Sequence, residues 1–390
     1  MDRDHLKKLD DILNEIVETK AFPGSMIMVL QDGKEMYFGA AGYRDLENKT
    51  LITRDTIFRL YSMTKPITAV AAWMLIEDGI ISLEDEVGKY IPTYKNQTVA
   101  DGWIINPVRR NMRIKDLLNM TSGLTYNGIL NITEHKTDEL VKEGIERMDS
   151  ENEMSTLELA SRLGEIPLVF SPGEGYNYGF SADVMGAVIE VVSGMKFGEF
   201  LKKRLFEPLG MEDTGFYVED SKRDRLAKVY QKTEEGYKEF HYNNLLINLK
   251  GEHAPAFESG GAGIFTTLDD YAKFATMLHK GGKHEGKRII GQETIKFMIG
   301  MSMEDMPRES LRKQNGQDGF EYCNLMRIMK DPSYANTIAV EGEYGWDGWL
   351  GPCFINDPVN KISILSMLQV TDAGFPPYMK RARNVIYSSL

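Results

Sequence analysis

The sequence is poor in the residues that bind nucleic acid, structural metals and anionic membranes. Its 390 residues include only two cysteines, Cys323 and Cys353, too few for a disulfide framework or a Cys-based zinc site. The 46 basic side chains are outnumbered by 58 acidic ones, which gives a net charge of −12 and leaves no basic run. We therefore expect no binding to nucleic acid or to a membrane. The six histidines are scattered without helix-face spacing, so we expect no metal site.

Long apolar segments are also missing. The longest, ITAVAAWMLI at 67–76, falls short of the roughly 18 residues that cross a bilayer, and a charged segment follows it. The first 20 residues are charged from the second position and lack the apolar core of a secretory signal peptide. We therefore expect a soluble, cytoplasmic protein whose two thiols are unpaired.

Several common catalytic motifs are absent as well. The chain has no G-x-S-x-G, which excludes the nucleophile elbow of the α/β-hydrolases. It also lacks a Walker A sequence, the H-E-x-x-H zinc motif and the G-x-G-x-x-G dinucleotide fingerprint. Phosphate-loop, zinc-peptidase and Rossmann-type chemistry are therefore not expected.

Length and patterning indicate two structural units. A chain of 390 residues exceeds the roughly 250–300 residues that one hydrophobic core supports. Apolar segments joined by tight turns predict strand hairpins near both ends, whereas the middle is mostly helical with long loops. The predicted fold class is α/β of the α+β type, an antiparallel sheet flanked by helices with an inserted all-helical lobe. Residues 1–79 and 246–390 would form a discontinuous α/β domain and residues 80–245 a mostly helical domain, with a ligand cleft between them.

Two segments are expected to lack regular structure. Residues 93–111 have the Asn, Gly and Pro content that is typical of a loop. Residues 303–335 are polar and irregular, and we interpret them as a surface insertion. The middle helices and this insertion are expected to shape the ligand pocket.

A Ser-x-x-Lys pattern is the motif that carries chemistry. Ser62 and Lys65 lie three residues apart at the start of a predicted helix, so their side chains share a face. Burial lowers the pKa of a lysine, and a neutral amine can take the serine proton and create a nucleophile. The pattern recurs at Ser193–Lys196 and Ser310–Lys313, but only Ser62 follows a strand and opens an apolar helix.

The sequence around Ser62 resembles a known superfamily. LYSMTKPITAVAAWMLIEDGIISLEDEVGKYIPTY at 60–94 is similar to the serine β-lactamases and penicillin-binding proteins, and among them to the class C β-lactamase-like esterases, the family VIII carboxylesterases. The likeness continues in order through residues 112–126, 167–194, 259–278 and 344–358. This resemblance implies a β-lactamase/transpeptidase-like fold, acyl-enzyme chemistry and no metal or organic cofactor.

The superfamily has a second motif, a tyrosine two residues before an asparagine, in which the tyrosine relays a proton together with the lysine. The register after Pro172-Gly173 assigns that tyrosine to Tyr178 and places Phe180 at the asparagine position. Tyr176 is the alternative if the register shifts by two residues. By analogy with the family, Tyr126 in the loop TSGLTY is expected to line the substrate pocket.

The third motif, Lys-Thr-Gly in β-lactamases, corresponds here to Trp346, Asp347 and Gly348, followed by Trp349. A Trp-x-Gly sequence is usual in the family VIII esterases. The small Gly348 would let substrate approach the strand backbone. The resemblance implies that the N–H groups of Trp349 and Ser62 together stabilise an oxyanion.

The departures from the β-lactamase pattern favour an esterase. Trp346 and Phe180 replace groups that hold the carboxylate and the acylamino side chain of β-lactams, and Asp347 adds negative charge near the cleft. The resemblance thus implies hydrolysis of small or medium carboxylic esters through an acyl-Ser62 intermediate. The alternatives are a β-lactamase, a D-amino-acid peptidase or amidase, an acyltransferase with the same chemistry, and a non-catalytic binding protein.

Overall fold

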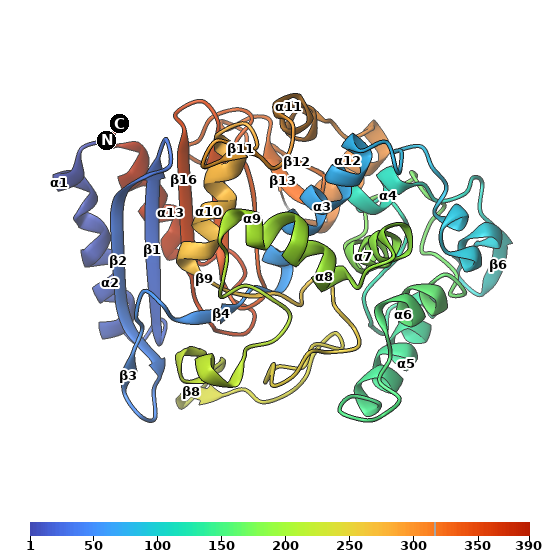
Figure 1. The fold of residues 1–390 in the computed structure, drawn as a ribbon, viewed down its shortest axis with the longest axis horizontal. Coiled ribbons are helices and arrows are strands. Elements are labelled where there is room, and N and C mark those ends of the chain that lie inside the picture. The colour runs from blue at the N-terminus through green and yellow to red at the C-terminus, as the bar shows by residue number, and fades with distance from the viewer. Residues whose placement is uncertain (316) are drawn as a thin grey trace.

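An antiparallel sheet of eight strands organises one side of the molecule (Figure 1). The computed structural model describes residues 1–315 and 317–390. The sheet strands are β1 (Gly24–Gln31), β2 (Lys34–Asp45), β3 (Thr50–Leu51), β12 (Phe320–Cys323), β13 (Met326–Met329), β14 (Tyr344–Asp347), β15 (Cys353–Asp357) and β16 (Ile362–Met367). Their order is β12-β13-β14-β15-β16-β1-β2-β3, so segments from both ends of the chain pair inside the sheet. The predicted antiparallel sheet flanked by helices is confirmed.

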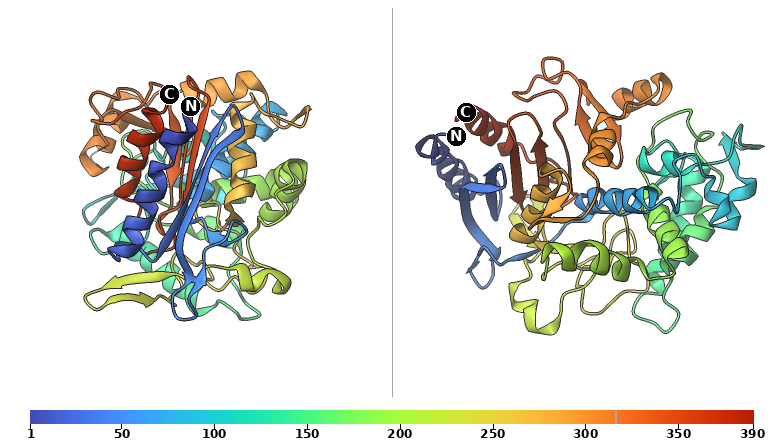
Figure 2. Two further views of the ribbon diagram at one scale, coloured as in Figure 1. Left: turned by 90° about the vertical axis from the view of Figure 1, so that its left-hand side faces the viewer. Right: turned by 45° about the horizontal axis from the view of Figure 1, so that its top comes forward.

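Helices cover both faces of this sheet. The α-helices are α1 (Arg3–Leu6), α2 (Lys8–Glu18), α3 (Lys65–Glu77), α4 (Ile114–Leu118), α5 (Ile132–Glu146), α6 (Thr156–Leu163), α7 (Ser181–Ser193), α8 (Phe197–Leu201), α9 (Glu207–Leu209), α10 (Leu268–His279), α11 (Gln292–Gly300), α12 (Asp305–Asn315) and α13 (Tyr378–Tyr387). Short 3₁₀ or π turns are η1 (Tyr61–Thr64), η2 (Val87–Lys89), η3 (Pro92–Asn96), η4 (Lys202–Phe206) and η5 (Asp220–Arg225). Helix α3 leads away from the sheet and packs on α7 (Figure 2).

The central strand β1 is buried on both faces, and its alternate residues enter two different cores. Met26 and Met28 join the large core that the sheet shares with α3, α7 and α10. Ile27 and Val29 point to the other face, which α2 and α13 cover side by side (Figure 2). Because both faces are covered, the strand is a continuous apolar run rather than an alternating one.

Within residues 1–315 and 317–390, four further pairs of strands lie outside the main sheet. They are β4 (Ile57–Arg59) with β9 (Phe265–Thr267), β5 (Thr98–Asp101) with β6 (Ile104–Pro107), β7 (Tyr230–Thr233) with β8 (Gly236–Glu239), and β10 (Lys283–His284) with β11 (Lys287–Arg288). The β4–β9 pair matters most for the site. It places the residues just before Ser62 beside residues 265–267, which follow the turn at 259–261.

The segment 93–111 is not a loop, contrary to the sequence-based expectation. It contains η3 and the β5–β6 hairpin, whose turn includes Gly102 with a φ of +59°. All four residues of β6 are exposed, and Trp103 beside it is 86% exposed. Because none of the hairpin residues is fully buried, its sequence lacks the alternation that identifies a strand.

The segment 303–335 is not a surface insertion either. It supplies α12 and the sheet strands β12 and β13, and only residue 316 lies outside the described residues. Tyr322, Leu325 and Ile328 are fully buried. The prediction was wrong because the polar residues on either side dominated the average composition and hid the apolar run at 320–329.

The helical middle of the chain also holds β-structure, since β5–β6 and β7–β8 both lie within residues 80–245. All strands of the main sheet come from residues 1–79 and 246–390. The division into these two domains stays a prediction.

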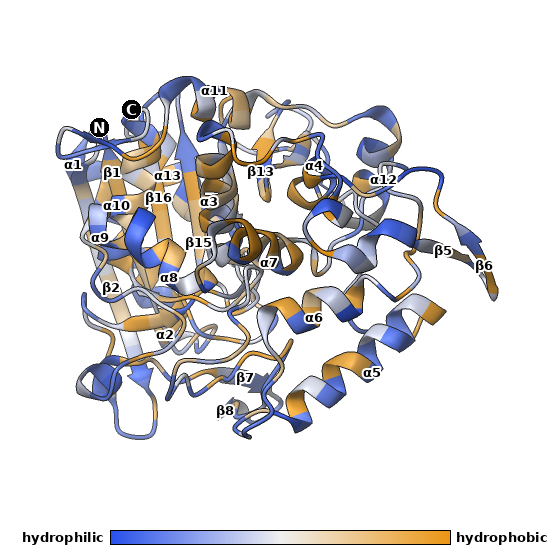
Figure 3. Cartoon of the chain, turned by 45° about the vertical axis from the view of Figure 1, so that its right-hand side comes forward, coloured by the Kyte–Doolittle hydropathy of each residue, from blue (hydrophilic) through white to orange (hydrophobic). Residues whose placement is uncertain are grey.

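Hydropathy separates buried helices from outer ones (Figure 3). α3 and α7 are hydrophobic along most of their length, whereas α5 alternates between apolar and polar residues. A helix that is apolar all round is expected in a core, and α3 is indeed buried from Lys65 to Leu75. Among the described residues, no helix is at once long and apolar enough to cross a membrane.

Candidate active site

The chain reaches Ser62 through a strained backbone. β4 leads into η1, and η1 continues into α3. Tyr61 has a φ of +46°, a left-handed conformation that is costly for a bulky side chain and is typical of functional sites. Pro66 lies in the first turn of α3, where its missing N–H costs no hydrogen bond. Ser62 is thereby held, partly exposed, next to the start of α3.

Lys65 is completely buried and is enclosed by three neutral oxygens. Its Nζ lies 3.2 Å from Ser62 Oγ, 3.1 Å from the Tyr126 hydroxyl and 2.9 Å from the Gly261 carbonyl oxygen. A protonated lysine has three N–H donors, and these three oxygens match them. The contact predicted between Ser62 and Lys65 is therefore present.

Burial lowers the pKa of Lys65 to about 7, because the charged ammonium is deprived of water. The carboxylates of Asp183 and Asp347 oppose this shift from a distance. Near neutral pH, a large fraction of Lys65 is therefore uncharged and can accept a proton from Ser62.

Tyr178 completes the group around Ser62. Its hydroxyl hydrogen-bonds with Ser62 and accepts a hydrogen bond from Trp346 Nε1 at 2.9 Å. Lys65 Nζ lies 4.6 Å from the centre of its ring. Burial raises the pKa of Tyr178, although the bonds from Ser62 and Trp346 oppose this, so the group is a neutral phenol near pH 7.

The alternative tyrosine lies elsewhere. Tyr176 is fully buried, and its ring packs against Tyr322 with centroids 5.3 Å apart. The structure thus places Tyr178, and not Tyr176, beside Ser62 and Lys65.

Tyr126 and Phe180 form an aromatic wall next to Lys65. The Tyr126 ring meets Tyr178 edge-on at 5.7 Å and Phe180 at 4.8 Å. Phe180 is only 1% exposed, so it lies behind Tyr126 and supports it. Tyr126 is partly exposed and reaches Lys65, which makes it the member of the pair that faces the site.

Gly348 allows the end of β14 to approach the backbone before Ser62. A Cβ on Gly348 would lie 2.1 Å from the Leu60 carbonyl oxygen, so any larger residue would push the two segments apart. Trp349 follows, with its ring 5.0 Å from that of Tyr61. In the described part of the chain, neither the Ser62 N–H nor the Trp349 N–H has a hydrogen-bond acceptor. Both amides are therefore available to an oxyanion.

Asp347 has a counter-charge that the sequence did not reveal. Its Oδ1 lies 3.3 Å from Arg327 Nη1, and the Arg327 guanidinium also lies 5.5 Å from the centre of the Trp346 ring. Burial raises the pKa of Asp347, while Arg327 opposes the shift. The negative charge expected near the cleft is therefore compensated. Arg327 was missed because it lies in the segment that we interpreted as an insertion.

Asp183 is a second residue that the sequence reasoning missed. It lies in the first turn of α7, 2% exposed, and it accepts hydrogen bonds from Ser259 Oγ and, at 3.0 Å, from the Gly261 N–H. These bonds fix the turn whose Gly261 carbonyl contacts Lys65. Burial raises the pKa of Asp183, and Lys65 opposes the shift. The available signal was a carboxylate in the first turn of a mostly apolar helix.

Two further features of the described chain lie apart from the group around Ser62 and share no residue with it. Asp149, Glu153 and His253 form a set of potential metal ligands. A cavity of about 550 Å³ lies along α8, α9 and residues 211–219. The group around Ser62 itself combines a hydroxyl nucleophile, a titrating amine, a phenol and two free amides, which is the equipment for acyl transfer.

The chain is similar in sequence and in structure to known hydrolases. Esterase EstB of Burkholderia gladioli is 27% identical over 399 residues, covering 98% of this chain and 95% of that protein. Lovastatin esterase of Penicillium rubens is 29% identical over 287 residues, covering 69% and 67% of the two chains. The structure of EstCE1, a hydrolase with promiscuous acyltransferase activity, superposes with a TM-score of 0.84 at 25% identity and covers 99% of each chain. The family model named Beta-lactamase matches residues 9–386, and the chain belongs to the Beta-lactamase family.

Proposed function

We propose that the protein is a serine hydrolase that cleaves carboxylic esters of small or medium acyl groups through an acyl-Ser62 intermediate. One observation carries the proposal: the fully buried Lys65, with a pKa of about 7, lies 3.2 Å from Ser62 Oγ. The esterases among its relatives support a small-molecule ester as the substrate.

The acylation step follows from the contacts. Ser62 Oγ attacks the ester carbonyl carbon while its proton passes to Lys65 Nζ, directly or through the Tyr178 hydroxyl. The carbonyl oxygen becomes an oxyanion between the N–H groups of Ser62 and Trp349. Tyr178 then gives a proton to the leaving alkoxide, Lys65 restores the phenol, and the alcohol departs from acyl-Ser62.

In deacylation, water is the nucleophile and Ser62 Oγ is the leaving group. Water attacks the acyl carbon and gives its proton to the base, and Ser62 Oγ leaves with a proton returned through Tyr178. If an alcohol or amine replaces water, the same steps transfer the acyl group. The promiscuous acyltransferase activity named for EstCE1 favours this as a second activity, which acceptor-dependent product formation would reveal.

The aromatic surroundings support an ester rather than a β-lactam substrate. Trp346 is engaged with Tyr178, and Phe180 is covered by Tyr126, so neither offers the polar group that a β-lactam side chain needs. Together with the Ser62-x-x-Lys65 motif, these residues support assignment to the family VIII esterases. The alternatives are a β-lactamase, which the substrate comparison below tests, and a D-amino-acid peptidase.

We also propose a cytoplasmic location. Both cysteines, Cys323 and Cys353, are buried and unpaired, as suits a reducing compartment. Fractionation of the source cells checks this, and recovery of the protein outside the cytoplasm would contradict it.

The decisive experiment compares p-nitrophenyl butyrate with a chromogenic cephalosporin. We expect the wild type to prefer the ester and the variant Ser62→Ala to lose at least about 10³-fold in kcat, because the nucleophile is removed. Ser193→Ala, in a second Ser-x-x-Lys sequence, is the matched control and should retain full activity. A preference for the cephalosporin would overturn the ester assignment, and full activity of Ser62→Ala would overturn the nucleophile.

A further inference from the structure

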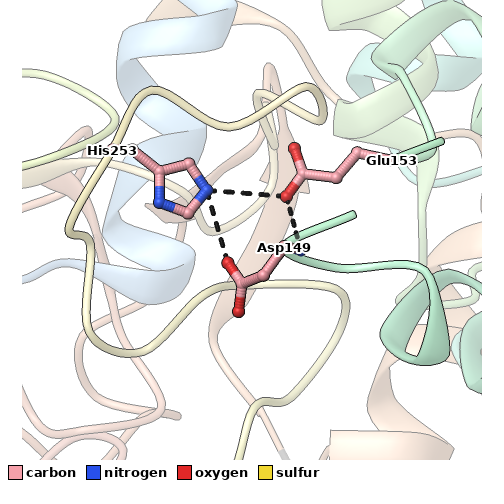
Figure 4. Close-up of side chains that lie close together, drawn as sticks. All are labelled: Asp149, Glu153 and His253. Carbon is pink, nitrogen blue, oxygen red and sulfur yellow. Dashed lines mark hydrogen bonds and ion pairs between the residues drawn. The ribbon is translucent and has the colours of Figure 1, made fainter. Parts of the chain in front are cut away.

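A second group of polar side chains gathers where two loops meet (Figure 4). Asp149 and Glu153 lie in the connection between α5 and α6, and His253 lies in the long loop between β8 and β9. Nε2 of His253 is 3.3 Å from Oδ1 of Asp149 and 3.6 Å from Oε1 of Glu153. Three atoms that can ligate a metal ion therefore converge from segments far apart in the sequence.

The distances of 3.3 and 3.6 Å from His253 Nε2 are long for hydrogen bonds and suit coordination. N–H···O hydrogen bonds span about 2.7–3.2 Å. A single imidazole N–H can also point at only one of the two carboxylates. A tetrahedral ion with bonds of about 2.0–2.1 Å holds its ligand atoms about 3.3–3.4 Å apart. The separation from Asp149 matches that value, the separation from Glu153 is slightly longer, and all three atoms lie within 4.8 Å of one another.

Neighbouring groups hold both carboxylates in place. Asn248 Nδ2 donates to Asp149 Oδ1 at 3.1 Å, and the Asp149 N–H donates to Glu153 Oε1 at 2.9 Å. The Ala256 N–H donates to the other Glu153 oxygen at 3.0 Å. Outer-shell bonds of this kind orient the ligands of metal sites. The His253 side chain is 47% exposed, which leaves an entry path and room for a water as fourth ligand.

We propose that Asp149, Glu153 and His253 bind a divalent transition-metal ion of the zinc type, which fastens residues 240–258 to the α5–α6 connection. The imidazole ligand favours Zn²⁺ over Mg²⁺ and Ca²⁺, which prefer oxygen ligands alone. The fastened loop runs directly into Ser259 and the turn that contacts Lys65. The sequence predicted no metal site because helix-face spacing of histidines cannot detect ligands that two loops bring together.

Titration calorimetry on the chelator-treated full chain, with Zn²⁺ alone as the probe, tests the site. We expect one saturable ion per chain in the wild type and no such binding in His253→Ala or Glu153→Gln. Asn248→Ala should bind about tenfold more weakly, because it removes an outer-shell bond. His241→Ala is the matched control: His241 is exposed in the same loop with a single carboxylate, Glu239, at 3.6 Å, and its loss should change nothing.

Thermal unfolding of the same variants tests the fastening of the loop. Zn²⁺ should raise the Tm of the wild type and of His241→Ala and leave that of His253→Ala unchanged. Saturable Zn²⁺ binding that survives in His253→Ala, or equal responses to Mg²⁺ and Zn²⁺, would overturn the proposal. Absence of binding in a wild type that is folded and active would show that the three residues form only an ion pair.

Discussion

Two buried basic side chains in different layers of the molecule have opposite surroundings. Arg383, in α13, contacts the Glu343 carboxylate, and Tyr387 donates a further hydrogen bond to that carboxylate at 2.8 Å. Both members of the ion pair are about 5% exposed or less. Lys65 is buried to the same degree but contacts only neutral oxygens. The two residues therefore differ in whether an anion contacts the buried basic group, and only Lys65 lacks one.

The largest expected effect is on Lys65. The variant Lys65→Met should lower kcat for the ester by about 10²–10⁴-fold, because it removes the base that activates Ser62. The wild-type rate should also rise with pH through about 7, as Lys65 loses its proton. A pH–rate profile of both proteins measures these effects, and a wild-type rate that falls through this range would contradict the assignment of Lys65 as base.

The same substitution should stabilise the fold. The folded-state pKa of Lys65, about 7, lies below its ordinary value of 10.5, so between these values the unfolded chain binds more protons. Stability therefore rises with pH over this range, and the cost of burying charged Lys65 is complete only below pH 7. Lys65→Met should gain about 1–3 kcal/mol in unfolding free energy at pH 6 and less near pH 10. Urea titrations at the two pH values check the sign.

The paired cation should behave in the opposite way. Arg383→Met leaves Glu343 buried without its counter-charge and should cost about 3–5 kcal/mol of stability. The activity per folded molecule, measured by active-site titration, should stay within about twofold of the wild type. The double variant Arg383→Met with Glu343→Gln is the control and should recover part of the loss. If folded Arg383→Met also lost activity, Arg383 would not differ from Lys65 in its role, and the contrast between the two residues would be wrong.

The smallest effect is expected from Asp183, which interacts with Lys65 at a distance. Asp183→Asn keeps an oxygen for Ser259 and Gly261 but removes the negative charge that raises the pKa of Lys65. The acid limb of the pH–rate profile should therefore move down by about one pH unit or less. The plateau rate should hardly change. A limb that moves upward would show that Asp183 does not influence Lys65 electrostatically.

Local patterns in the sequence predicted the parts of the structure that depend on neighbours in the chain. The hairpin of β1 and β2 and that of β15 and β16 follow from apolar runs and tight turns. Ser62 and Lys65 meet because they are three residues apart at a helix start. Their contact with Tyr178 was reached only through the family resemblance, since no local rule links residues so distant in sequence.

The residues and strands that the sequence did not predict depend on tertiary contacts, or were hidden when composition was averaged over a long segment. Gly261 reaches Lys65 only because β9 pairs with β4, and nothing near either residue announces that pairing. The sequence analysis missed Arg327 and Tyr322 because their short strands lie within a polar stretch of sequence. Tyr322 nevertheless belongs to the surroundings of the site, since its ring centre lies 4.8 Å from that of Trp346. The exposed β5–β6 hairpin shows the converse, because a strand without a buried face leaves no periodic signal.

The position of β1 between β16 and β2 has a consequence for folding and breakdown. Pairs such as Met26 with Met367 join the two ends of the chain, so the sheet cannot close until nearly the whole chain is available. A fragment that ends before Trp346 would contain Ser62 and Lys65 yet lack the strand that supplies Trp346 and Trp349. Its β1 would also expose an apolar, unpaired edge that invites aggregation. Proteolysis within the last strands should therefore abolish catalysis and solubility together, so that damaged copies would be insoluble rather than partly active.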